Sequence, residues 1–156
     1  MKHLTCLLFA IAIPSFCSAD VTKLSAEDRK ALEDLSRFHE VHSTGDLPAA
    51  ILALFGGDNG SIAEPGQKWN ATDAITDPTL PAKRLIWAAI GSEYFVVHFE
   101  RGGIAHTFHI LVAKLAKNEA KPKVVWFGTG GPLKNYAAFL DALQSGKLDD
   151  RLDYAH

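Results

Sequence analysis

The sequence predicts an α+β domain, with helices and strands in separate parts of the chain. Apolar residues recur at helical spacing in residues 25–57, four mostly apolar runs within residues 84–128 are separated by hairpin and loop signals, and a last helical pattern covers residues 133–146. Elements segregated in this way favour an antiparallel sheet covered by helices. The predicted architecture is an N-terminal helical hairpin, a four-stranded antiparallel meander and a C-terminal helix packed on the sheet.

Residues 1–19 are predicted to be a secretory signal peptide that precedes the domain. Lys2 gives a short basic start, and the apolar run LTCLLFAIAI that follows is too short to span a bilayer as a helix. Small side chains at the −3 and −1 positions fit cleavage after Ala19. We therefore expect a periplasmic or secreted protein whose single domain is formed by residues 20–156.

The placement of the two cysteines bears on where the domain folds. Cys6 and Cys17 both lie in the predicted signal peptide, so cleavage leaves a domain without cysteine. Such a domain has no disulfide, thiolate metal site or thiol nucleophile. A lipid anchor on Cys17 is an open alternative. Phe16 argues against it, because lipoprotein signals resemble one another in having a small residue just before the cysteine.

Composition and motifs exclude several classes of function. The formal net charge of −2 argues against a nucleic-acid-binding protein, which usually has a strong basic bias. After the signal peptide, no stretch is apolar enough to span a membrane. No serine has a GxSxG context, and GTGGP before the last helical pattern lacks the Lys-Ser/Thr of a phosphate loop. The sequence assigns no enzymatic activity, and a non-catalytic protein is the favoured interpretation.

The N-terminal helical hairpin is predicted from caps and spacing. Residues 25–45 form the first helix in this prediction, since Ser25 and Asp28 fit a capping box. A shorter helix follows over residues 46–57, with Asp46 as its cap. The apolar stripe of the first helix consists of Leu32, Leu35, Phe38 and Val41.

Residues 56–82 are predicted to form a long loop. This stretch is rich in Gly, Pro, Asp, Asn and Thr and shows no apolar periodicity. Loops of this length in compact domains are uncommon and often functional. Trp69 is expected to attach the loop to the body of the domain, which makes it a candidate binding residue. The four strands are predicted over residues 84–90, 93–100, 104–115 and 124–128.

The segment HFERGGIAHTFHI, at the second hairpin, holds three of the seven histidines. If Gly102 and Gly103 form a two-residue turn, His98 and His109 are diagonal neighbours on one semi-polar face. Glu100 follows two residues after His98 and shares that face. Two imidazoles and a carboxylate are suitable ligands for zinc. This register therefore predicts a candidate metal site at His98 and His109.

Other registers remove this site. A three-residue turn places His98 opposite His106 and moves His109 to the other face, because a slip of one residue exchanges the faces of a strand. Histidines on the wet face of a strand also occur without any function. In the two-residue register His106 lies on the apolar face, where it would be a hydrogen-bonded core histidine.

Three hypotheses about function follow. The leading one is a small exported, non-catalytic binding protein that recognises an envelope protein, as an inhibitor or immunity-type factor does. The alternative is a metal-binding protein or metal-dependent hydrolase that uses the hairpin face, with zinc as the possible cofactor and Glu100 as ligand or base. The third is a structural or stress-related envelope protein whose histidines respond to pH. The oligomeric state stays open. The candidate binding residues are His98, Glu100, Arg101, His109 and Trp69.

Overall fold

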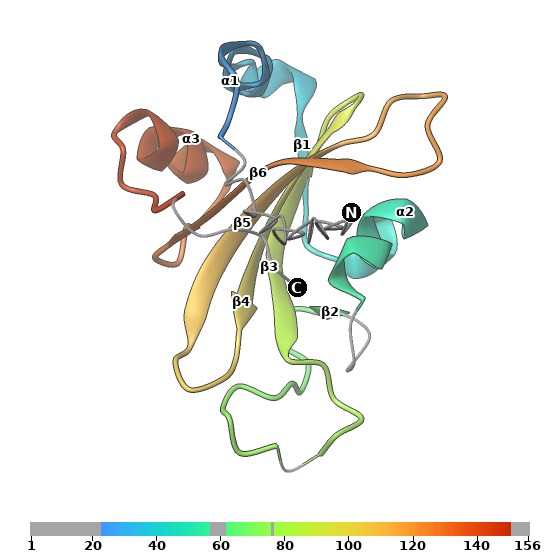
Figure 1. Ribbon diagram of the computed structural model, residues 1–156, viewed down its shortest axis with the longest axis vertical. Coiled ribbons are helices and arrows are strands. Elements are labelled where there is room, and N and C mark those ends of the chain that lie inside the picture. Colours follow the sequence, from blue (N-terminus) through green and yellow to red (C-terminus); the bar gives the residue numbers. More distant parts are fainter. Residues whose placement is uncertain (1–22, 57–61, 76, 151–156) are drawn as a thin grey trace, which may run out of the picture.

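The computed structural model describes residues 23–56, 62–75 and 77–150 (Figure 1). The predicted signal peptide and its cleavage site lie outside these residues. The α+β class is confirmed. The helices and strands are α1 (Ala26–Glu33), β1 (His39–Val41), α2 (Ala49–Leu52), β2 (Ile62–Ala63), β3 (Lys83–Ile90), β4 (Tyr94–Arg101), β5 (Thr107–Lys114), β6 (Lys123–Gly130) and α3 (Tyr136–Gln144). Three short 3-10 helices are η1 (Leu35–Arg37), η2 (Thr44–Asp46) and η3 (Ala53–Phe55).

The sheet is larger than the four strands that the sequence predicted. Five of its six strands follow the order β1-β3-β4-β5-β6, and the sixth, β2, pairs with β3 outside this order. The pairing of β2 with β3 is parallel, and every other pairing is antiparallel. β1 joins the C-terminal half of β3, while β2 joins its N-terminal end. The additional strands therefore share one edge of the sheet.

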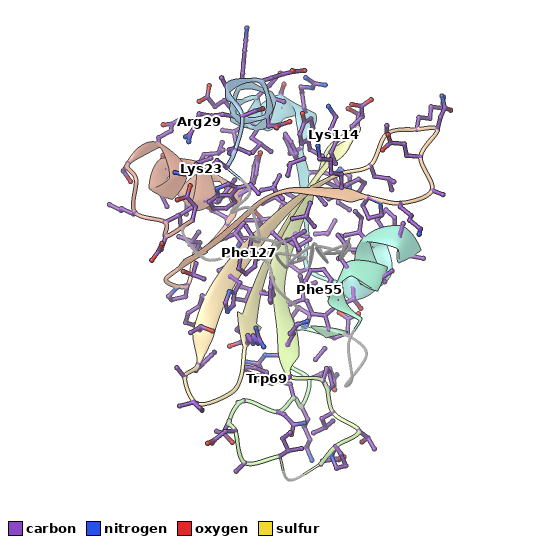
Figure 2. The ribbon with its side chains drawn as sticks, viewed as in Figure 1. Lys23, Arg29, Phe55, Trp69, Lys114 and Phe127 are labelled. Atoms are coloured by element: carbon purple, nitrogen blue, oxygen red, sulfur yellow. The ribbon has the colours of Figure 1, made fainter. Side chains whose placement is uncertain are left out.

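Each face of the sheet carries its own hydrophobic core. α1 and α3 pack on one face, and α2 with η3 packs on the other (Figure 1). Figure 2 shows Phe55 of η3 beside the sheet, in the same core as Phe127. The first core includes Leu32, Trp87, Val96, Ile110, Phe139 and Leu140, and the second includes Ile51, Phe55, Leu85, Phe99, Leu111 and Phe127.

The predicted helical hairpin is wrong beyond its first turns. Ser25 does cap α1, because its side chain accepts a hydrogen bond from the Asp28 N–H. The helix stops at Glu33, where Asp34 leaves the helical conformation and its carboxylate accepts the Ser36 N–H instead. Leu35 is consequently 51% exposed rather than part of an apolar stripe. The chain then extends into β1, and α2 has a single turn.

The described residues of the predicted loop have a defined structure of their own. They include β2, whose two residues are buried against β3. The side chain of Asn70 is buried and donates hydrogen bonds to the carbonyl oxygens of Asp77 and Leu80. The backbone N–H of Asn70 donates to the carbonyl oxygen of Pro81. Asn70 therefore holds the loop together from inside.

Within the described residues, no helix combines the length and apolarity needed to cross a membrane.

Candidate functional site

The hairpin of β4 and β5 has a register that neither predicted turn gives. Arg101 pairs with Thr107, so five residues, 102–106, connect the strands. The two glycines do not form a tight turn because they pack against the long loop. The Gly102 N–H donates to the carbonyl oxygen of Ala82, and Gly103 forms a bridge with Thr72. Both predicted registers are thus wrong.

This register separates the two histidines of the predicted metal site. His98 pairs with Ile110 and faces the core under α3, whereas His109 pairs with Phe99 and faces the other core. Their side chains therefore lie on opposite faces of the sheet, and Glu100 lies on the face of His98. Among the described residues, no three His, Cys, Asp or Glu side chains are grouped so that they could hold a metal ion.

His98 has a structural environment. It is fully buried, and the Leu133 N–H donates to its Nε2 at 3.0 Å. Since Nε2 accepts this bond, the proton is assigned to Nδ1, which donates to the carbonyl oxygen of His109 at 2.9 Å. Burial lowers the pKa of His98, so the neutral ring is favoured. Both ring nitrogens are occupied, and neither has a lone pair available for a metal.

His109 is held between two aromatic rings. It stacks on Phe99 and Phe127 with centroid distances of 5.3 Å to each, and its Nε2 lies 2.7 Å from the Thr107 hydroxyl. Its Nδ1 is buried and has no hydrogen-bond partner among the described residues. Burial, with smaller contributions from Arg101, His98 and Lys83, lowers the pKa of His109 to about 4.

The low pKa of His109 predicts a loss of stability in mild acid. In the unfolded chain an imidazole titrates near 6.5, so it binds a proton more readily than the folded protein does. The stability that the neutral His109 ring contributes is therefore fully present above pH 6.5 and is lost as the pH falls towards 4. Between pH 7 and pH 5 we expect His109 to cost about 2 kcal/mol of unfolding free energy.

Urea unfolding at pH 7 and pH 5 measures this effect. His109→Phe keeps a stacked ring without a titratable group, so its stability should fall by about 2 kcal/mol less than that of the wild type over this pH interval. His98 and the carboxylates are present in both proteins and cancel in the comparison. Equal losses in the two proteins would contradict the prediction.

Glu100 is the centre of a polar cluster on the face of His98. Its carboxylate is 6% exposed and accepts hydrogen bonds from Arg84 Nε at 2.5 Å and from His106 Nε2 at 2.6 Å. The Arg84 guanidinium lies 5.0 Å from the ring centroid of Trp69, and the Trp69 and His106 rings are 5.4 Å apart. We call these four residues the Glu100 cluster. It fixes the loop and the hairpin connection to the sheet.

The structure brings together some predicted site residues and not others. Glu100 and Trp69 belong to the same cluster. Figure 2 shows Trp69 where the loop meets the sheet. His106 was predicted to be a core histidine but is half exposed there. Arg84 was not singled out, because its pairing with Glu100 across β3 and β4 follows only from the register.

The Glu100 cluster supports one end of the molecule, which we call the tip. The tip consists of residues 69–75 from the loop and 102–106 from the hairpin, joined by the bridge between Thr72 and Gly103 (Figure 1). Two aliphatic side chains are exposed on it, Ile104 at 96% and Ile75 at 56%. The tip therefore combines apolar side chains in water with polar contacts to the buried Glu100 carboxylate.

Comparisons with protein-family models, with curated proteins and with solved structures found no match to this chain. A functional assignment therefore rests on the tip, the Glu100 cluster and the surrounding charges.

Proposed function

We propose that this chain is a small exported binding protein that recognises a protein partner through its tip. The observation that carries this proposal is Ile104, which is 96% exposed on a segment held by tertiary contacts. Export is supported by the signal-peptide pattern of residues 1–19. The partner is a protein with an apolar pocket large enough for an aliphatic side chain.

The way in which Ile104 is presented supports this role. Single exposed apolar residues are common and need no function. Here, however, the connection between β4 and β5 is tied to the long loop at Gly103, and His106 is tied to the buried Glu100 carboxylate. A segment that is already ordered loses less conformational entropy when it binds, so more of the contact energy remains as affinity.

The chemistry around Ile104 also fits a protein interface. Trp69 and His106 belong to the tip and Arg84 packs against Trp69, and aromatic and arginine side chains are enriched where proteins bind one another. Ile75 adds a second aliphatic contact in the same region. An apolar centre with polar and aromatic surroundings is the usual organisation of a binding surface of this kind.

A charge substitution at Ile104 tests the proposal. Immobilised wild-type protein is used to capture envelope proteins from the source cells, and bound proteins are quantified by mass spectrometry. Ile104→Asp is expected to weaken capture of the partner about 30-fold, the effect of losing a contact worth about 2 kcal/mol. Leu35→Asp is the matched control, because Leu35 is also exposed but lies beside α1, away from the tip.

The comparison between the variants decides the result. Partners that are lost with Ile104→Asp and kept with Leu35→Asp support recognition through the tip. If the wild type captures no protein saturably, or if both variants retain the same set, the tip is not a binding surface. Urea unfolding of each variant is measured alongside, so that a loss of folding is not counted as a loss of binding.

A further inference from the structure

The face of the sheet opposite the Glu100 cluster carries a row of polar side chains at the tip end. Lys83 pairs with Arg101 across β3 and β4, and Arg101 pairs with Thr107 across β4 and β5. Paired residues project from the same face. The next row inward on this face is Leu85, Phe99 and His109. Lys83, Arg101 and Thr107 thus lie side by side at the margin of the core that contains Phe99.

The two cations of this row lack an acidic partner among the described residues. Arg84, the neighbour of Lys83, points to the other face and binds Glu100, whereas no described carboxylate pairs with Lys83 or Arg101. Burial lowers the pKa of the half-buried Lys83, and the charge of Arg101 lowers it further. Like charges directly opposite each other in a sheet are destabilising. The row therefore carries two positive charges that nothing in the described chain compensates.

Thr107 and His109 supply hydrogen bonding beside these charges. The Thr107 hydroxyl lies 2.7 Å from His109 Nε2. Burial, with smaller contributions from the charges of Arg101, His98 and Lys83, lowers the pKa of His109 and keeps the ring neutral at neutral pH, so one ring nitrogen is a donor and the other is an acceptor. If Nε2–H donates to the Thr107 oxygen, the hydroxyl proton of Thr107 is free to donate outward. The buried Nδ1, which has no partner in the described residues, is then an unpaired acceptor.

We propose that Lys83, Arg101 and Thr107 form a binding site for a dianionic oxyanion of the phosphate class. A phosphate group carries close to two negative charges at neutral pH and several acceptor oxygens. It therefore compensates both cations and accepts a hydrogen bond from the Thr107 hydroxyl, whereas a carboxylate would leave one cation uncompensated. This site lies on the face opposite the Glu100 cluster, and the inference is independent of the proposed partner recognition.

Titration with inorganic phosphate tests the site. The probe is followed by NMR at constant ionic strength and pH 7.5, using the Thr107 amide and the His109 ring. We expect saturable shifts at both residues. Lys83→Gln and Arg101→Gln should each weaken binding at least tenfold. Arg37→Gln and Lys121→Gln remove exposed cations elsewhere and should leave binding unchanged.

The titration of His109 gives a second measurement on the unmodified protein. Burial is the main cause of its low pKa, and the charges of Arg101 and Lys83 on this face and of His98 on the other lower the pKa further. A bound dianion compensates the charges of Arg101 and Lys83, so saturating phosphate should raise the His109 pKa above its value of about 4. An unchanged His109 pKa at saturation would place the anion elsewhere and overturn the assignment.

Three further probes define the ligand. Sulfate, also a dianion, should bind at the same residues, whereas acetate should bind much more weakly at matched ionic strength. O-phosphoserine and inorganic phosphate are compared to identify the source of the group. Tighter binding of the ester indicates a phosphorylated molecule, and tighter binding of phosphate indicates the free ion. Equal binding of acetate, the absence of saturation, or unchanged binding in Lys83→Gln and Arg101→Gln would overturn the proposal.

Discussion

Replacing His98 with alanine is expected to lower the free energy of unfolding by about 4 kcal/mol. The substitution removes a fully buried ring and leaves a cavity beside Trp87, whose ring centroid lies 5.3 Å away. It also leaves the Leu133 N–H and the His109 carbonyl oxygen without the bonds that the imidazole makes. Because small domains are stable by only about 5–15 kcal/mol, a large part of the stability would be lost.

Urea unfolding at pH 7.5 measures this loss. His39→Ala is a suitable control, since His39 is exposed on β1 and its replacement should change stability by no more than about 0.5 kcal/mol. A loss below about 1 kcal/mol in His98→Ala would contradict the buried, hydrogen-bonded position of His98, because removing a buried ring alone predicts a larger loss.

Gly102→Ala is expected to cost about 3 kcal/mol and to displace the long loop from the hairpin. A Cβ atom at this position would lie 2.0 Å from the Asn70 carbonyl oxygen and within 2.8 Å of the Ala71 backbone. These are main-chain atoms, so no side-chain rotation relieves the overlap. The loop or the hairpin has to move, and the hydrogen bond from the residue 102 N–H to Ala82 is lost with it.

Gly131→Ala provides the control for this substitution. Gly131 follows β6, and an added Cβ there has no neighbour within 4 Å. Urea unfolding is combined with amide hydrogen exchange at residue 102, which should become fast in Gly102→Ala and stay protected in Gly131→Ala. Protection in both variants, with equal stability, would show that the tip does not need this close approach.

The sheet was the most predictable part of the fold, because its strands have local signals. The runs that became β3, β4, β5 and β6 are mostly apolar stretches bounded by turn or polar residues in the sequence, and their observed bounds lie within three residues of the predicted ones. α3 was also recognisable from apolar residues at helical spacing, and Asn135 caps it. These patterns depend on neighbours a few residues apart, which a sequence displays directly.

The N-terminal segment shows where such patterns mislead. Leu32, Leu35, Phe38 and Val41 have the spacing of a helix, but Asp34 ends α1 through its bond to the Ser36 N–H. β1 then gains its hydrogen bonds from β3, some 50 residues further along the chain. A three-residue strand carries little signal of its own, and its stability comes from that distant partner.

The site was predictable in its residues and not in its geometry. Glu100 and Trp69 were both singled out, and both belong to the Glu100 cluster. Arg84 meets Glu100 through the pairing of β3 with β4, and His106 lies in a hairpin connection whose Gly102 packs against Asn70 and Ala71. No local turn rule contains that contact, because Gly102 lies more than 30 residues after Asn70 and Ala71 in the chain.

The burial of Asn70 has a consequence for how this chain can be produced. Asn70, Ala71 and Thr72 form an Asn-X-Thr sequence, the acceptor for N-linked glycans. In the folded domain Asn70 is 5% exposed, and its side-chain nitrogen donates to the carbonyl oxygens of Asp77 and Leu80. A glycan attached before folding would remove one of these bonds and prevent the loop from closing. We therefore expect the native tip not to form in protein that is glycosylated at Asn70 in a eukaryotic secretory route, and to form in protein produced in a cell without this modification.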